Sequence, residues 1–357
     1  MELLKKMRNK KILVISLSGI GNTILFTPFL NSLRENYPQT EIDFLTLNQG
    51  MADVVSGSNL VDNIFVLSKK PFRILKTIWR LRKKHYDYSV TAFPSNKWQF
   101  NMLAFLIGAK NRITHKYKCC RLRTLSFLQN KKIPAIEGIH DVEQNMNLLK
   151  VFGINPENEE RKLTFSISEE DKKFAEDFLR QNCLENKFLV GIHPGCNKDN
   201  KYRRWPKEYF VKLINYLTEK EKNSLLFFGP DEVEEVIWIH NNINDKSKVF
   251  LIGEKNLKNV GALIAKCKVF ISTDSGLGHG ATALRIPTLA IFGPAQVLRT
   301  SPYGKYGHYI SLNLPCSPCL KYPFHSTSSK IKCNRNFECL RNIKVEDVIN
   351  KINEILK

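Results

Sequence analysis

Residues 268–294 constrain the fold of this chain more than any other stretch. They read KVFISTDSGLGHGATALRIPTLAIFGP. An apolar, β-rich run at 269–271 leads into a polar, glycine-bearing turn at 272–278, a helical segment at about 279–285 and a second apolar run at 288–292. Strand, turn, helix and strand in this order predict a β-α-β unit of a parallel sheet. The turn should then lie at the carboxyl edge of that sheet, where open α/β proteins bind ligands.

The composition of this turn suits a bound phosphate or diphosphate. Backbone N–H groups at the start of a helix have no partner within the helix, and serine and threonine hydroxyls stand beside them. The alternative is an ordinary strand–helix connection whose glycines permit close packing. A glycine-rich turn alone does not separate the two interpretations.

The same alternation of strands and helices runs through both halves of the chain. Residues 11–17 (KILVISL) predict a strand before a glycine turn at 18–22, and FLVGI (188–192) predicts another before His193-Pro194-Gly195-Cys196. Thr27-Pro28 has two interpretations, a helix that starts there or a helix from Asn22 that is kinked at Pro28. The rhythm predicts an α/β fold with two doubly wound Rossmann-like domains that face each other across a cleft. We expect an N-terminal domain at 1–165, a C-terminal domain at 175–340 and a final helix at 341–357 that packs back toward the N-terminal domain.

The charge of the chain favours an anionic partner. Lys and Arg outnumber Asp and Glu by 55 to 34, which gives a formal charge of +21, although a lysine-rich genome would contribute to such an excess. Residues 69–86 predict an amphipathic basic helix with Ile74, Leu75, Ile78 and Leu81 facing inward. Its basic face is either simply solvated or a contact for a membrane surface or an anionic substrate. Residues 110–132 are also rich in Lys and Arg. They predict either a basic loop on the acceptor side or a solvent-exposed loop without a binding role.

Four cysteines near the C-terminus form a spaced set. Cys316, Cys319, Cys333 and Cys339 follow the pattern C-x2-C-x13-C-x5-C in a proline-containing segment. Four thiolates at such spacing predict a closed, structural zinc site. The alternatives are free thiols, or disulfides, which a reducing compartment disfavours. No stretch approaches the ~20 apolar residues that cross a bilayer, and the short apolar run after the basic N-terminus is better explained as a strand than as a signal peptide. We therefore expect a cytoplasmic protein.

Three segments in register resemble glycosyltransferase family 9, the lipopolysaccharide heptosyltransferases. They are GIGNTILFTPFLNSLRENYP, HPG followed by RRWP, and STDSGLGHGATALRIPTLAIFGP. The resemblance covers nearly the whole chain. It implies the GT-B architecture and metal-independent, inverting transfer of a sugar, usually a heptose from ADP-heptose, to a lipopolysaccharide-core or related anionic glycan or glycolipid acceptor. It also implies a donor site for the nucleotide sugar in the C-terminal domain at 175–340, an acceptor site in the N-terminal domain at 1–165, and peripheral contact with the cytoplasmic face of the inner membrane.

The resemblance assigns roles to individual residues of both domains. Asp274, Ser275, Gly276 and Leu277 match the family's turn at the donor diphosphate and sugar, and His279 matches the histidine that follows. Glu232 matches an acidic position near the nucleotide ribose. Arg203 stands where relatives have a lysine and is the expected catalytic cation, with Lys201 as the alternative. The glycine turns of the other two motifs complete the predicted donor-binding set with Gly21, Thr23 and His193.

Asn22 departs from the family pattern at the expected catalytic position. Many relatives have an aspartate there, which the resemblance implies is the base that takes the acceptor proton, and an asparagine cannot accept that proton. Another carboxylate could serve, with Asp53, Asp62 and Asp141 as candidates. Alternatively, Asn22 only orients the acceptor, or the protein binds a sugar nucleotide without efficient transfer. We expect an active enzyme because the donor motifs are intact.

Two other classes of function compete with this prediction. A polyanion-binding protein would use the positive charge to bind nucleic acid, but the sequence contains no recognition motif, aromatic RNA-binding signature or zinc-finger helix. We therefore expect no nucleic-acid partner. A sugar-nucleotide epimerase of similar two-domain shape would need its own pair of carboxylates.

Overall fold

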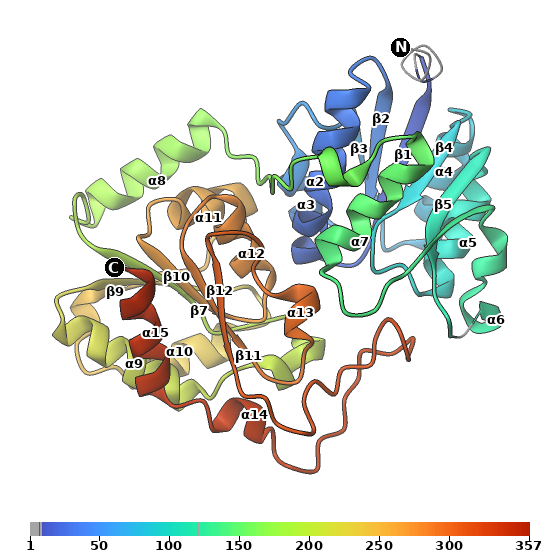
Figure 1. Cartoon of the computed structure of the whole chain (residues 1–357). Helices are drawn as coiled ribbons and strands as arrows, with labels where there is room; N and C mark the ends of the chain where they lie inside the picture. Colours follow the sequence, from blue (N-terminus) through green and yellow to red (C-terminus); the bar gives the residue numbers. More distant parts are fainter. Residues whose placement is uncertain (1–6, 8, 120) are drawn as a thin grey trace. The chain divides into compact units, whose positions relative to one another are not determined.

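The computed structural model describes residue 7, residues 9–119 and residues 121–357, and it divides the chain into two compact units. The first unit extends to Ser166 and includes Lys321–Ser329, and the second comprises Ile167–Leu320 and Lys330–Lys357. Each unit contains a six-stranded sheet whose strands all run parallel, with helices on both faces (Figure 1). The predicted α/β class with two doubly wound, Rossmann-like domains is confirmed.

The sheet of the first unit has the strand order β3-β2-β1-β4-β5-β6. The helices α2, α3 and α7 pack together on one of its faces, and α4, α5 and α6 form a second group. In chain order, its principal elements are β1 (Lys11–Ser16), α2 (Ile20–Asn36), β2 (Glu41–Thr46), α3 (Gln49–Val55), β3 (Asn63–Val66), α4 (Pro71–Arg82), β4 (Tyr88–Thr91), α5 (Trp98–Ile107), β5 (Asn111–Lys116), α6 (Arg121–Thr124), the 3-10 turn η1 (Ser126–Leu128), β6 (Lys131–Pro134), α7 (Asp141–Asn147) and the 3-10 turns η2 (Leu148–Phe152) and η3 (Pro156–Asn158).

Helix α2 runs through Pro28 and does not begin there. It starts at Ile20, after Gly19 at φ 117°, and ends at Asn36. Proline has no N–H to donate to the carbonyl four residues earlier. The hydroxyl of Thr27 donates to the carbonyl of Ile24 at 2.7 Å instead, so that carbonyl keeps a partner. Of the two interpretations of Thr27-Pro28, the continuous helix is the one observed.

The sheet of the second unit has the strand order β12-β11-β10-β7-β8-β9. Helices α8, α11 and α12 form one packed group, whereas α9 packs with α10 and α15. The elements are α8 (Glu169–Gln181), β7 (Leu189–His193), η4 (Lys198–Arg203), α9 (Lys207–Glu219), β8 (Asn223–Phe227), α10 (Val233–Asn241), η5 (Lys246–Lys248), β9 (Val249–Ile252), α11 (Leu257–Ile264), β10 (Val269–Thr273), α12 (Gly276–Ala283), β11 (Thr288–Phe292), α13 (Val297–Thr300), β12 (Gly307–Ser311), α14 (Glu338–Arg341) and α15 (Val345–Ile355).

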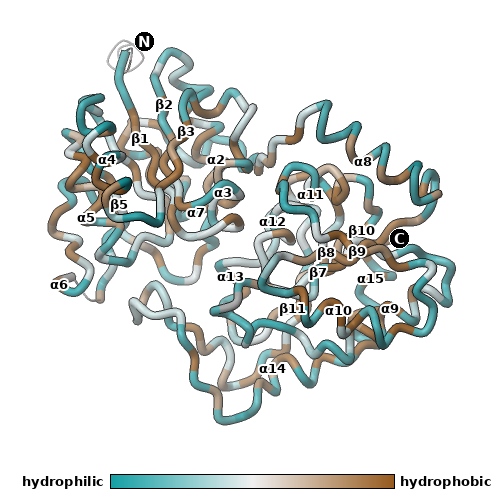
Figure 2. The backbone as a smooth tube through the Cα atoms, turned by 180° about the vertical axis from the view of Figure 1, so that it is seen from behind, coloured by the Kyte–Doolittle hydropathy of each residue, from teal (hydrophilic) through white to brown (hydrophobic). Residues whose placement is uncertain are grey.

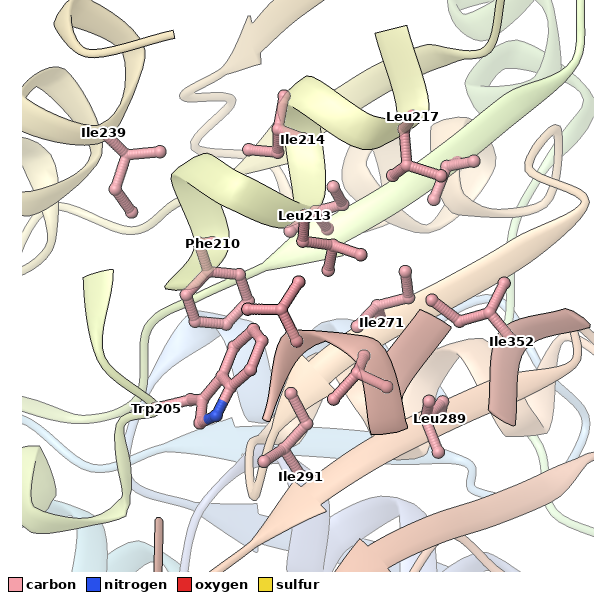
Figure 3. Close-up of a cluster of buried hydrophobic side chains, with 14 of the residues drawn as sticks. Trp205, Phe210, Leu213, Ile214, Leu217, Ile239, Ile271, Leu289, Ile291 and Ile352 are labelled. Atoms are coloured by element: carbon pink, nitrogen blue, oxygen red, sulfur yellow. The ribbon is translucent and has the colours of Figure 1, made fainter. Parts of the chain in front are cut away.

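A large apolar cluster holds the second unit together. Trp205, from the RRWP motif, is fully buried between α9 and the strands (Figure 3). Its indole N–H donates to the carbonyl of Ile343 at 3.0 Å, so the buried polar atom has a partner. The motif tryptophan is therefore a core residue that anchors the loop carrying Arg203.

The final helix differs from its prediction. We expected residues 341–357 to pack toward the N-terminal domain, but Val345, Val348 and Ile352 of α15 belong to the apolar core of the second unit. Helix α15 packs on α9, and Ile352 is seen beside Leu289 in Figure 3. The apolar face of this amphipathic helix is buried there because α9 offers a matching apolar stripe. Conversely, Lys321–Ser329 belongs to the first unit, where the amide of Asn96 donates to the carbonyl of Pro323 at 2.6 Å.

Within the described part of the chain, every helix is too short or too polar to cross a membrane.

Candidate active site

The candidate site lies at the switch point of the second sheet. Strands β7 and β10 are neighbours there, and the chain leaves them toward opposite edges, through β8 and through β11. His193 ends β7, Asp274 and Ser275 follow β10, and Glu232 follows β8. All four therefore meet at the carboxyl edge, at the position where doubly wound sheets bind ligands.

Asp274 is the electrostatic centre of this edge. Its buried carboxylate accepts a hydrogen bond from Nη1 of Arg203 at 2.9 Å. Arg299, on α13, is also buried and its charge acts on the same carboxylate. Burial raises the pKa of Asp274, and the charges of Arg203 and Arg299 oppose that rise. A guanidinium held in place by this carboxylate, at the carboxyl edge of the sheet, is the kind of cation that binds a diphosphate.

A second network links the three motif turns. Nδ1 of His193 lies 2.9 Å from Oγ of Ser275, and its Nε2 lies 3.1 Å from Oε2 of Glu232. The same Glu232 oxygen accepts from the backbone N–H of Gly229 at 2.6 Å. Although burial favours the neutral acid, His193 and the Gly229 N–H hold the pKa of Glu232 below its usual value. The carboxylate is thus ionised and fixed in place.

Gly195 is required by the position of Glu232. A Cβ on residue 195 would lie 2.1 Å from both Cδ and Oε1 of Glu232, which is far inside van der Waals contact. We expect Gly195→Ala to displace the Glu232 carboxylate from His193 and Gly229, and so to lower nucleotide affinity about tenfold with a stability loss of about 1–2 kcal/mol. Calorimetric titration with nucleotide and thermal unfolding measure the two effects.

Gly229→Ala is the matched control for this variant. A Cβ on residue 229 would lie 3.5 Å from Oε2 of Glu232, an ordinary contact, so its affinity should stay within about twofold. Equal losses in the two variants would contradict a role for Glu232 in holding the nucleotide.

The start of α12 presents free backbone donors beside this network. Ser275 is its N-cap residue, but its hydroxyl makes no capping bond because it contacts His193. Ser275, Gly276 and Leu277 are partly exposed, so the first N–H groups of α12 are open to an anion. Further into the helix, Gly278 packs so closely on β10 that a Cβ would lie 2.6 Å from Oγ of Ser272.

His279 lies inside α12, next to the charged cluster. It is buried, and burial together with the charge of Arg203 lowers the pKa of His279 to about 4. The imidazole is therefore neutral at neutral pH. Its Nδ1 has no hydrogen-bond partner among the described residues. Lys201 lies in η4 close in sequence to Arg203, but it is exposed and, unlike Arg203, forms no ion pair with Asp274 in the described structure.

The predicted site residues of the first motif lie in the first unit, at the carboxyl end of β1. The side-chain amide of Asn22 donates to the carbonyl of Ser18 at 2.9 Å, and Gly21 is partly exposed in the first turn of α2. Thr23 is fully buried, and its hydroxyl bonds to Ser16 and to the carbonyl of Gly19. The Thr23 hydroxyl thus has internal partners, and its contact with the donor stays a prediction.

The three candidate carboxylates for proton removal do not all lie at the same edge of the first sheet. Asp62 accepts from the N–H of Ile42 at 2.7 Å and from Arg34 at 2.8 Å, at the amino end of β2 and away from Asn22. Asp53 lies in α3, which starts from the carboxyl end of β2. Asp141 begins α7, four residues before Asn145, whose amide donates to the carbonyl of Leu25 in α2. Asp53 and Asp141 therefore share the Asn22 edge, and Asp62 does not.

The four C-terminal cysteines carry free thiols. Cys319 is partly buried, and burial together with the nearby thiols of Cys333 and Cys316 raises its pKa. The thiols are thus neighbours, but among the described residues no three Cys, His, Asp or Glu side chains converge in a way that could hold a metal ion. The structural zinc site stays a prediction.

Arg299 and Tyr202 are site residues that the sequence interpretation missed. Tyr202 lies beside the Arg203 guanidinium, with Cζ of Arg203 5.8 Å from its ring centroid, and stacks on Phe337. Arg299 follows β11, the strand next to β10. Its sequence signal is weak: one basic residue in a short helix after Gly293-Pro294.

The comparisons with known proteins first define the class of fold. Along nearly its whole length the chain is similar to the solved structure of a family 9 glycosyltransferase from Veillonella parvula (TM-score 0.79, 23% identity, 99% of each chain covered). It is also similar to the E. coli ADP-heptose lipopolysaccharide heptosyltransferase II (TM-score 0.75, 23% identity, 97% of this chain and 98% of that one). With two doubly wound sheets of this topology, the fold is of the GT-B class.

The family follows from a direct match to the sequence. The family model described as glycosyltransferase family 9 (heptosyltransferase) matches residues 74–328, and the chain belongs to this family. Among curated proteins, lipopolysaccharide heptosyltransferase 3 of E. coli K12 is 26% identical over 292 residues, which cover 79% of this chain and 82% of the relative. The predicted family is confirmed, and the protein is a glycosyltransferase.

Proposed function

We propose that this protein is an inverting heptosyltransferase that moves a heptose from ADP-heptose to a lipopolysaccharide-core acceptor. The observation that carries the proposal is the cluster of Arg203, Arg299 and Asp274 beside the open start of α12. This arrangement suits a leaving nucleotide diphosphate. The relatives support the sugar and the acceptor, since they are lipopolysaccharide heptosyltransferases and one of them is an ADP-heptose lipopolysaccharide heptosyltransferase.

The proposed reaction is a single in-line displacement. The acceptor hydroxyl oxygen attacks the anomeric carbon as the bond from that carbon to the diphosphate oxygen breaks, and the sugar passes through an oxocarbenium-like state. Negative charge accumulates on the diphosphate as it leaves. Arg203 and the N–H groups of α12 stabilise this charge, so transfer needs no catalytic metal.

Asp274 and Glu232 hold this machinery in place. Asp274 orients the Arg203 guanidinium through an ion pair. Glu232, fixed by His193 and Gly229, offers a carboxylate to the hydroxyls of the nucleotide ribose. The acceptor, an anionic glycolipid, would be presented at the cytoplasmic face of the inner membrane.

The acceptor proton needs a base other than Asn22. Asp53→Asn and Asp141→Asn are two single variants that test the candidates. We expect one of them to lower kcat by at least about 100-fold, the usual contribution of a general base. Nucleotide affinity should stay unchanged in that variant, because both residues lie in the first unit. Asp62→Asn is the control, since Asp62 lies at the opposite edge of the sheet. If all three variants retain full kcat, the interpretation that another carboxylate replaces the family aspartate is wrong.

Calorimetric titration with ADP, GDP, UDP and ADP-heptose tests the donor site. The proposal predicts micromolar binding of ADP and ADP-heptose, with much weaker binding of GDP and UDP. Tighter binding of UDP or GDP would show that the donor carries uridine or guanosine in place of adenosine. Absence of binding by all four would remove the basis for a transferase.

A further inference from the structure

Positive charge is concentrated in one part of the first unit. Residues 63–136 contain seventeen lysines and arginines but a single acidic residue, Asp87. About one fifth of the chain therefore supplies sixteen of its twenty-one net positive charges. Asp87 is itself engaged by Lys10 and Lys110. The segment includes α4, α5 and α6.

Helix α4 has two apolar stripes, only one of which faces the core. Leu81 is buried, and Ile78 packs beside it against Leu13, Ile15 and the residues of α5. On the other stripe, Phe72, Leu75 and Trp79 are exposed by 78%, 62% and 58%. Their spacing of three and four residues places them on one face of the helix. This corrects the prediction that Leu75 faces inward.

Exposed apolar side chains on the neighbouring helices extend this stripe. Helix α5 packs against α4, and α6 and η1 pack against α5, so the helices lie together along one side of the first unit (Figures 1 and 2). We call this surface the α4–α6 face. It carries Trp98, Phe105 and Leu106 of α5, together with Leu122 of α6 and Phe127 of η1, all exposed by more than a third. Eight large apolar side chains on one side of a unit exceed the scatter of a normal surface.

The α4–α6 face surrounds these apolar groups with cations. The exposed cations of α4 and its flanks form no ion pair with a carboxylate of the described chain; they are Lys69, Lys70, Arg73, Lys76, Arg80, Arg82 and Lys83. Nζ of Lys83 lies 3.5 Å from the ring centroid of Trp79, so cationic and aromatic groups are intermixed. A helix face that is simply solvated exposes its polar side chains and buries its apolar ones. The α4–α6 face exposes both kinds.

We propose that the α4–α6 face docks on an anionic lipid bilayer. Phe72, Leu75 and Trp79 would enter the boundary between headgroups and acyl chains, where aromatic side chains are favoured. The surrounding lysines and arginines would meet lipid phosphates. A second copy of the chain is a poor occupant because it would bring the same unpaired positive charge. The inference stands on this surface alone and does not depend on the identity of the donor or acceptor.

Vesicle co-sedimentation of the full-length protein tests the proposal. The wild type should bind mixed phosphatidylethanolamine–phosphatidylglycerol vesicles, lose most of that binding in high salt, and bind pure phosphatidylcholine weakly. Phe72→Ser/Leu75→Ser/Trp79→Ser should bind the anionic vesicles at least about tenfold more weakly. Arg73→Glu/Lys76→Glu should also bind at least about tenfold more weakly, since each cation near such a surface is worth about fivefold.

Matched variants of the second unit control for general hydrophobicity and charge. Val233→Ser/Ile237→Ser/Leu298→Ser removes exposed apolar groups there, and Lys173→Glu/Lys255→Glu reverses exposed charges there; both should bind vesicles like the wild type. Thermal unfolding and nucleotide binding of the α4 variants should be unchanged, because the altered side chains are exposed and lie outside the donor site.

Several results would overturn the proposal. Equal vesicle binding by the wild type and the α4 triple variant would place the membrane contact elsewhere, and absence of binding by the wild type would exclude it. A wild-type dimer that the triple variant converts to a monomer, without vesicle binding, would make a second copy the occupant. Binding of an RNA oligomer in place of vesicles would assign the face to nucleic acid. Nucleotide binding, measured on the same samples, separates these failures from failure of the proposed enzymatic function.

Discussion

Asp274→Asn is expected to lower transfer by at least about 100-fold and to destabilise the second unit by about 3 kcal/mol. The carboxylate is the buried counter-ion of Arg203, with the charge of Arg299 acting on the same site. Removing its charge leaves the Arg203 guanidinium without the carboxylate that it pairs with, and breaking a largely desolvated ion pair by removing one partner is costly. The reoriented Arg203 no longer faces the leaving diphosphate, so kcat falls together with nucleotide affinity.

Initial-rate kinetics, nucleotide titration and thermal unfolding separate the parts of this effect. Asp231→Asn is the matched control, since Asp231 is an exposed acid on the same edge and should change none of the three quantities appreciably. Asp274→Glu keeps the negative charge but moves it, so it should restore the free energy of unfolding more fully than it restores kcat. An Asp274→Asn enzyme with wild-type kcat would show that the Arg203 geometry does not matter for transfer.

Arg203→Met should reduce kcat by about 10²–10³ while nucleotide affinity falls far less. The diphosphate gains charge as the glycosidic bond breaks, so a cation beside it stabilises the transition state more than the bound donor. The folded state should tolerate the change better than Asp274→Asn, because Asp274 keeps the nearby charge of Arg299. Single-turnover kinetics with ADP-heptose, compared with ADP binding, measure this difference.

Lys201→Met decides between the two cations that the sequence offered. Lys201 is exposed in η4, whereas Arg203 is held by the buried Asp274. A flexible exposed lysine contributes little to a pre-organised site, so Lys201→Met should retain kcat within about threefold. A larger loss in Lys201→Met than in Arg203→Met would make the lysine the catalytic cation.

Local patterns predicted much of the fold. Alternating apolar runs, glycine turns and helices gave both doubly wound sheets, because a buried parallel strand must be apolar throughout and a β-α turn must be tight. The DSGL turn was predicted at a carboxyl edge, and Asp274 lies there. These features could be predicted because each depends on a few residues that are adjacent in the sequence.

The remaining features depend on tertiary contacts that no local pattern encodes. The sequence shows that α15 is amphipathic but not which surface it packs on. Its position follows from the apolar stripe of α9. The charge of Arg299 acts on Asp274 because β11, which precedes α13, lies beside β10 in the sheet. Leu75 fits an inward stripe by spacing alone, yet α4 buries only the stripe that contains Leu81. The hydrogen bond between the hydroxyls of Thr23 and Ser16 is likewise a contact that no local pattern predicts.

A direct transfer assay tests whether the protein moves a heptose from ADP-heptose to a lipopolysaccharide core. Purified protein is incubated with ADP-heptose and a heptose-free lipopolysaccharide core, and the acceptor is weighed by mass spectrometry while ADP is quantified. We expect the acceptor to gain one heptosyl residue for each ADP released, and Asp274→Asn to abolish both signals. ADP release without a heavier acceptor, or an unchanged donor although ADP-heptose binds tightly, would contradict a heptosyltransferase acting on this acceptor.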